Sequence, residues 1–107
     1  MIVPAAHLEW VPFHAAPGVS DADLLAAAER LHREFLAHQP GYVRRCLLRD
    51  ADGSFVDSVH WRSADDHAAA MAVAMTHPAA QAFFACLADP DAAGAAMRHF
   101  AVVRDWT

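Results

Sequence analysis

Apolar and polar residues alternate along residues 55–61, which is the period of two expected of a β-strand. The more apolar side of this strand contains Asp57 and ends at Trp61. Ser63 follows closely and is well suited to cap a helix, which we predict over residues 63–75. A carboxylate among bulky apolar neighbours is either paired or functional. We expect the other segments to cover or extend this strand–helix unit.

Further strands are predicted where a similar alternation recurs. They span residues 7–13, 42–49 and 97–104. Residues 50–53 combine aspartate and glycine and predict a tight hairpin between the second of these strands and residues 55–61. The chain thus provides four strands, which is enough for one small sheet.

Two further helical segments are predicted from capping signals and apolar spacing. Ser20 opens a motif similar to a capping box, and its helix is expected to end before Pro40. Pro78 interrupts the later helix, so a separate short helix is predicted over residues 79–87. Residues 89–94 are predicted to form a loop.

The order strand, helix, strand, strand, helix, strand predicts an α+β fold of the ferredoxin-like βαββαβ type, in one domain over residues 1–107. Its four-stranded antiparallel sheet carries the helices on one face, and the first strand lies between the third and the fourth. The other face needs a cover. A second copy of the same sheet is the expected cover, which predicts a homodimer.

Charge excludes two classes of partner. The formal net charge is −5 and the eight Lys/Arg residues form no long run, so neither nucleic acid nor an anionic membrane is an expected partner. No apolar stretch approaches the roughly 20 residues of a membrane span. With no sign of a basic leader at the N-terminus, we expect a cytoplasmic protein.

Three short motifs resemble those of a known protein family. Residues 13–18 (FHAAPG) precede a capped helix, residues 39–42 (QPGY) open a strand, and residues 59–63 (VHWRS) lead into the second helix. This arrangement resembles the antibiotic-biosynthesis-monooxygenase-like proteins of the dimeric α/β barrel superfamily. The resemblance implies homodimers with a pocket in each subunit between sheet and helices. It also implies one of several activities, including cofactor-independent quinone-forming oxygenases and haem-degrading oxygenases.

The haem-degrading branch fits this chain poorly. The resemblance implies that its pocket needs an asparagine on the first strand, a tryptophan within the second helix and a histidine beyond it. Residues 7–13 contain no asparagine and residues 64–75 no tryptophan, while His77 falls at the helix break. We therefore expect no haem.

A catalytic group is predicted from residues that share the helix-facing side of the sheet. Glu9, Asp57 and His99 have the parity that would bring them around one cavity, where a histidine oriented by a carboxylate can act as a base and a second carboxylate can hold a proton. Such a set could take a proton from a phenol or an activated C–H group. The substrate-binding wall is predicted to comprise Trp61, Val11, Phe13, Met71, Met75 and Phe83.

Two alternatives remain open at this point. His99 and one acid could form a structural pair, with Glu9 in an interface or in solvent, because a strand shifted by one residue reverses every side chain. His7, His60 and His99 lie on adjacent strands, but His60 has the opposite parity to Asp57, so these histidines cannot share one face. His14, His32, His38 and His67 are expected at the surface.

The sequence therefore predicts a cofactor-independent monooxygenase-like or proton-transfer enzyme without a metal. Its ligand would be a hydrophobic aromatic or polyketide-like small molecule. The absence of a GxGxxG motif or a P-loop agrees with the expectation of no organic cofactor. The alternatives are a non-catalytic ligand-binding or stress-related dimer and, less favoured, a metal- or haem-dependent member. Whether the chain is an enzyme at all stays open.

Overall fold

The computed structural model of the chain describes residues 5–106. Four antiparallel strands form one sheet in the order β2-β3-β1-β4. Their bounds are β1 His7–Phe13, β2 Tyr42–Arg49, β3 Phe55–Trp61 and β4 Arg98–Ala101. β1 lies between β3 and β4, as predicted, and the α+β ferredoxin-like arrangement is confirmed.

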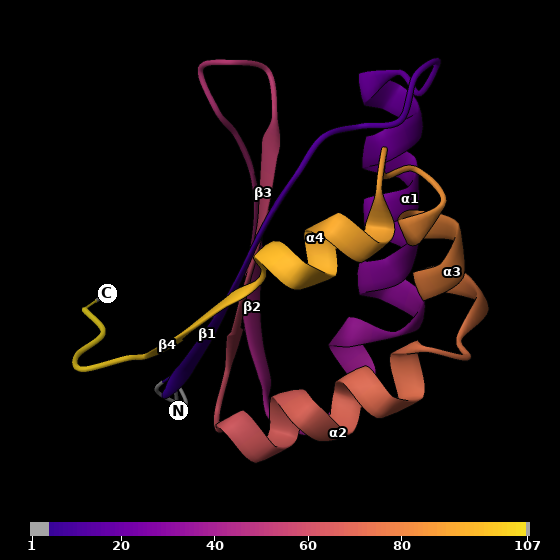
Figure 1. Ribbon diagram of the computed structural model, residues 1–107. Coiled ribbons are helices and arrows are strands. Elements are labelled where there is room, and N and C mark those ends of the chain that lie inside the picture. The colour runs from indigo at the N-terminus through magenta and orange to yellow at the C-terminus, as the bar shows by residue number, and fades with distance from the viewer. Residues whose placement is uncertain (1–4, 107) are drawn as a thin grey trace.

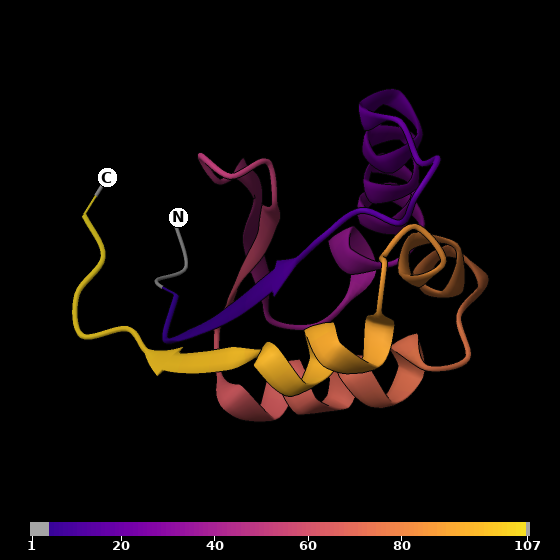
Figure 2. The ribbon, with the colours of Figure 1, turned by 45° about the horizontal axis from the view of Figure 1, so that its top comes forward.

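The helices lie on one side of the sheet (Figures 1 and 2). They are α1 Asp21–Glu34, the 3-10 turn η1 Leu36–His38, α2 Ala64–Ala74, α3 Pro78–Phe84 and α4 Pro90–Ala96. Figure 1 shows the sheet nearly edge-on, and no helix of residues 5–106 covers its other face. That face is therefore available to a partner.

α1 forms where the capping motif predicts it. The Ser20 hydroxyl accepts a hydrogen bond from the Asp23 amide at 3.0 Å, and the Asp23 carboxylate accepts one from the Ser20 amide. Its apolar stripe is buried in the hydrophobic core through Leu24, Ala28 and Leu31. This packing supplies one wall of the space beneath the helices.

The predicted loop over residues 89–94 is wrong, because α4 occupies this stretch. Asp89 caps the helix by accepting a hydrogen bond from the Ala92 amide at 3.0 Å. Pro90 follows as the first helical residue, where its fixed backbone angle suits a helix start. The sequence pattern for this helix was weak, because its seven residues are mainly alanine and include no stripe of large apolar side chains.

The last strand is shorter than predicted. β4 spans only Arg98–Ala101, although the Val102 amide still donates to the Ala6 carbonyl at 2.9 Å. Beyond this point the chain leaves β1, and Val103 is almost fully exposed. The exposed tail therefore follows directly from the end of pairing with β1.

The sheet register determines which side chains face the helices. Glu9 lies opposite Val59 on β3 and opposite His99 on β4, while Val11 lies opposite Asp57. Glu9, Asp57 and His99 therefore share the helix-facing side, because opposed residues of an antiparallel pair point to the same face.

None of the helices within residues 5–106 is long and apolar enough to cross a bilayer. The longest, α1, has 14 residues, whereas a spanning helix needs about 20. The cytoplasmic location remains a prediction.

Candidate functional site

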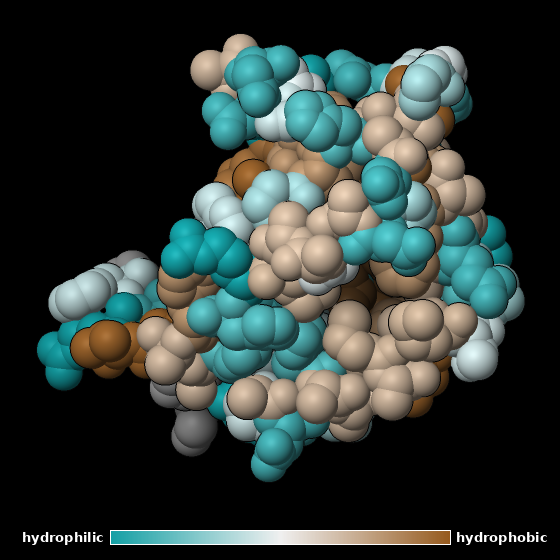
Figure 3. Space-filling model, in the orientation of Figure 1, coloured by the Kyte–Doolittle hydropathy of each residue, from teal (hydrophilic) through white to brown (hydrophobic). Residues whose placement is uncertain are grey.

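A cavity of about 460 Å³ lies between the helix-facing side of the sheet and the helices. Figure 3 shows its mouth as a hollow with a hydrophobic floor between α2 and α4. The volume falls within the roughly 300–1,000 Å³ that is usual for small-molecule sites. The mouth connects this space with solvent.

The lining is mainly apolar and aromatic. Five of the six predicted wall residues lie in it, namely Val11, Phe13, Met71, Met75 and Phe83. Trp61 is not among the lining residues; it is fully buried, and its ring packs against Tyr42 and His67. Further lining comes from residues outside that predicted wall, among them Leu31, Phe35, Leu36, Ala80, Phe84, Leu87, Ala93, Gly94 and Met97.

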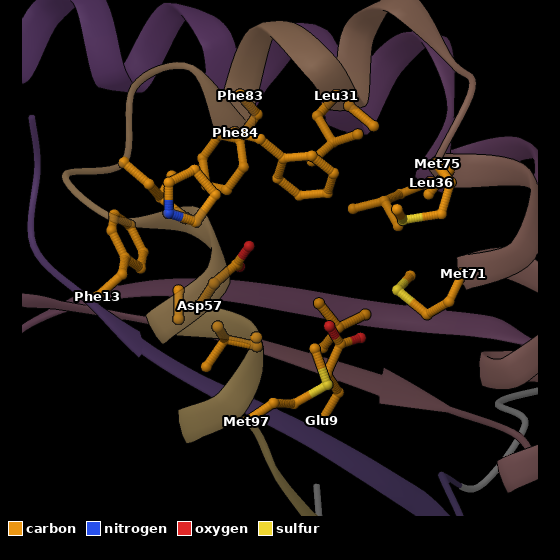
Figure 4. A pocket seen from close by; sticks show the side chains of 18 of the residues that line it. Glu9, Phe13, Leu31, Leu36, Asp57, Met71, Met75, Phe83, Phe84 and Met97 are labelled. Carbon is orange, nitrogen blue, oxygen red and sulfur yellow. The ribbon is translucent and has the colours of Figure 1, made fainter.

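Glu9 brings a carboxylate to the sheet side of this cavity (Figure 4). The residue is only 6% exposed. Its Oε1 accepts a hydrogen bond from Trp61 Nε1 at 3.1 Å. His67 Nε2 lies 3.2 Å from the same oxygen. This is a polar contact and not a hydrogen bond, because the two groups are not aligned for one. Trp61 thus fixes the position of the acid.

Asp57 is the second carboxylate of the cavity, and it is held in a buried ion pair. Arg45 Nε and Nη2 donate to the two carboxylate oxygens of Asp57, each at 2.8 Å. Arg45 also donates to the Ala28 carbonyl at 2.8 Å and stacks over Phe83 at 5.1 Å from the ring centroid. Burial raises the pKa of Asp57 above its ordinary value, while the hydrogen bonds and charge of Arg45 oppose that rise and Glu9 adds to it.

His99 faces the helices but is not a lining residue of the cavity. Its Nδ1 lies 3.1 Å from Nε2 of His7, and its ring centroid is 5.1 Å from that of His67. The structure therefore brings Glu9 and Asp57 to one cavity, and His99 to a histidine cluster beside it. The cluster meets the cavity through the contact of His67 with Glu9.

The expectation that His67 lies at the surface is wrong. His67 is 6% exposed, because the first turn of α2 packs it against Trp61, with ring centroids 5.7 Å apart. Its position on a helix of mostly small residues concealed this burial from the sequence. His60 lies opposite Leu8, on the other face of the sheet, as its parity predicts.

The residues at the haem-related positions have other roles here. β1 carries no asparagine and α2 no tryptophan. His77 caps α3, since its Nδ1 accepts a hydrogen bond from the Ala79 amide at 3.1 Å. Its ring also packs on Phe35, with centroids 5.0 Å apart. The expectation that no haem is bound remains a prediction.

Solved structures with the same arrangement of elements were found, whereas no family model and no curated protein matches the chain. SnoaB of Streptomyces nogalater, a cofactor-independent oxygenase solved in a mutant form, is 27% identical over 96% of this chain and 97% of that chain, with a TM-score of 0.65. A putative antibiotic biosynthesis monooxygenase from Bordetella bronchiseptica is 18% identical over 94% and 100%, with a TM-score of 0.74.

A third structure shares the fold at lower identity. It is a monooxygenase from the gene ActVA-Orf6 of Streptomyces coelicolor in complex with the ligand Nanaomycin D, and it is 12% identical over 96% of this chain and 92% of that chain, with a TM-score of 0.60. These likenesses show an antibiotic-biosynthesis-monooxygenase-like protein. The likeness to SnoaB, at 27% identity, points beyond the fold to a monooxygenase-like role at the level of that group, whereas the structures at 18% and 12% identity show the fold alone.

Proposed function

We propose that the chain is a cofactor-independent oxygenase-like enzyme that acts on a flat, hydrophobic, hydroxylated aromatic molecule. The observation that carries this proposal is the buried Glu9 carboxylate at the wall of an otherwise apolar cavity. Such a wall accepts aromatic rings, and a fixed carboxylate can take a proton from a phenol or from an activated C–H group. The likeness to SnoaB, a cofactor-independent oxygenase, supports the same class of reaction.

Glu9 is the base in this proposal, and Asp57 has a different role. Both oxygens of Asp57 accept hydrogen bonds from Arg45, which leaves that carboxylate less free to take a proton. Within residues 5–106 a hydrogen bond engages only Oε1 of Glu9, so Oε2 is the atom that we assign to the proton. The Asp57–Arg45 pair then holds the wall around the ring in place. His99 stands outside the lining, so it has no direct part in the proton transfer.

The reaction can be written without any group beyond the chain, substrate and dioxygen. Glu9 removes a proton from a substrate methylene or phenol, and the resulting carbanion or phenolate passes electrons to O2. A peroxide then forms on the ring carbon, and its outer oxygen takes the proton back from Glu9. Loss of water leaves a carbonyl, so a methylene and O2 become a ketone and one water. The apolar wall favours this path because the delocalised anion is large and poorly hydrated.

The test is oxygen uptake with a tricyclic hydroxyanthrone, monitored together with the absorbance of the quinone product. The proposal expects one O2 consumed per quinone formed, with EDTA-treated protein as active as untreated protein. Tight binding of the hydroxyanthrone with no oxygen uptake above the spontaneous rate would instead favour the non-catalytic ligand-binding alternative.

A variant at the mouth of the cavity tests where the ligand binds. Gly94 lines the cavity, and a side chain built there would meet nothing within 4 Å. Gly94→Phe is expected to weaken binding of the tricyclic ligand about tenfold, since the added ring takes ligand space. Gly94→Ala is the matched control and should leave affinity unchanged while strengthening α4 by up to about 1 kcal/mol. Calorimetric titration measures both, and equal affinity in the two variants would contradict the placement.

We further propose that the bare face of the sheet pairs with a second copy of the chain. The accessible surface of 6495 Å² exceeds the about 5,800 Å² expected of a monomer of 11.6 kDa. Leu48 and Phe100, which belong to the uncovered side, are 40% and 36% exposed. Covering these side chains would remove apolar surface from water.

Phe100→Asp tests this pairing. The buried charge is expected to raise the dissociation constant of the dimer at least about a hundredfold, which corresponds to about 2.8 kcal/mol. Sedimentation equilibrium of the parent chain should give twice the chain mass, and the variant should give the single chain mass. Val73→Asp, on the 51% exposed side chain of α2, is the control and should stay dimeric. A monomeric parent chain would refute the pairing.

A further inference from the structure

Three histidines from different elements meet at the edge of the sheet beside the cavity. His7 belongs to β1, His67 to α2 and His99 to β4. One ring nitrogen of each lies within 4.8 Å of those of the other two. The pair of His7 Nε2 and His99 Nδ1 is already 3.1 Å apart. Three nitrogens at metal–nitrogen distances of about 2.0–2.1 Å in a tetrahedral site are about 3.3 Å apart, so side-chain rotations that shorten the longer separations would complete the set.

The chemistry of this cluster favours a cation that accepts lone pairs. An imidazole offers a nitrogen lone pair to a transition metal, because only an unprotonated nitrogen can bind the ion. His67 Nε2 is buried and has no hydrogen-bond partner among residues 5–106, so no hydrogen bond to these residues fixes the orientation of the ring.

Glu9 completes the surroundings that a metal-bound histidine requires. A histidine that binds a metal through one nitrogen usually donates its other N–H group to a carboxylate or carbonyl oxygen. Glu9 Oε1, 3.2 Å from His67 Nε2, stands where such an acceptor is needed once the ring turns to bind through its other nitrogen. His99 is exposed, so the ion has access from solvent and a fourth position open to water.

We propose that His7, His67 and His99 form a binding site for a divalent first-row transition metal ion such as Zn²⁺ or Cu²⁺, with Glu9 as the acceptor for His67. The three histidines lie outside the cavity lining, whereas Glu9 also lines the cavity, and metal binding does not depend on the proposed oxygenase reaction. A bound ion would tie α2 and β4 to β1 at the sheet edge. It would also fix the orientation of His67 against the carboxylate that lines the cavity.

The test is metal titration of untagged, EDTA-treated protein. Calorimetry with Zn²⁺ is expected to show one ion per chain, and Cu²⁺ is expected to give an electron paramagnetic resonance spectrum with nitrogen hyperfine coupling. His7→Gln and His99→Gln should each weaken Zn²⁺ binding at least tenfold. Both residues have partly or fully exposed side chains, so these variants are expected to fold.

His14→Gln is the matched control, because His14 is exposed and lies outside the cluster. It should bind Zn²⁺ like the parent chain. No binding by the parent chain, or equal binding by the His7→Gln/His99→Gln double variant, would overturn the proposal. Because the titration contains no aromatic ligand and no oxygen assay, its outcome is independent of whether the chain is an oxygenase.

Discussion

Glu9→Gln is expected to lower kcat for oxidation of the tricyclic substrate at least about a hundredfold, the range usual for loss of a general base. Glutamine is nearly the same size, and its carbonyl oxygen can still accept the hydrogen bond from Trp61. It cannot take a proton from the substrate at neutral pH. Binding of the substrate should therefore persist while turnover is lost, and steady-state oxygen uptake with a separate binding titration measures both quantities.

Glu29→Gln provides the control for the Glu9 variant. Glu29 is exposed on α1 and does not line the cavity, so the same chemical change there should leave kcat within about twofold of the parent value. If Glu9→Gln kept the parent kcat, Glu9 could not be the base. Loss of binding together with kcat would instead assign Glu9 to ligand recognition.

Arg45→Met is expected to destabilise the fold by about 3–5 kcal/mol, because it leaves the Asp57 carboxylate buried without its counter-ion. The substitution also removes the hydrogen bond to the Ala28 carbonyl and the stacking on Phe83. Methionine keeps similar volume, so a cavity contributes little of the loss. Urea unfolding of the two chains measures the difference.

The pH dependence of this loss follows from Asp57. Burial raises the pKa of Asp57 above the ordinary 3.8, and Arg45 opposes the rise, so removal of Arg45 raises that pKa further. In the variant, the pKa of Asp57 is higher in the folded state than in the unfolded state. At a pH between these two pKa values the folded state binds the proton and the unfolded state does not, so stability falls as pH rises through this window. The penalty should therefore be largest at neutral pH and should shrink as pH falls toward 3.8.

Arg45→Met combined with Asp57→Leu separates the ion pair from other effects. Replacing both members by apolar residues removes the unpaired charge, and most of the lost stability should return. The double variant should also lose the pH dependence attributed to Asp57. A penalty for Arg45→Met that stayed constant from acid to neutral pH would show that Asp57 is not its source.

The strands could be predicted from the sequence because a period of two is visible whatever the strands pair with. β1 and β2 therefore match their predicted bounds, and Glu9 and Asp57 share the predicted face. The partner of Asp57 was not predicted, since Arg45 reaches it diagonally across a register that the sequence does not state. The signal available was that Arg45 has the same parity as Leu47, on the side of β2 that faces the helices.

The histidines show a second limit. The alternation of residues along the strand correctly assigned His99 to the helix-facing side of the sheet. It could not show that His99 falls outside the cavity lining, because the edge of the cavity depends on where α2 and α4 lie above the sheet. His67 belongs to a helix of mostly small residues, which has little contrast between its faces, so its burial could not be predicted. Sequence patterns therefore located the faces of the sheet, while tertiary packing determined which polar groups meet.

A crystal structure of the chain with a hydroxylated tricyclic quinone would test the central claim most directly. We expect the rings to lie between Phe83 and the sheet, with a phenolic oxygen within hydrogen-bond distance of Glu9 Oε2. A ligand bound on the bare face of the sheet, or one in the cavity with its hydroxyl groups turned away from Glu9, would contradict the account.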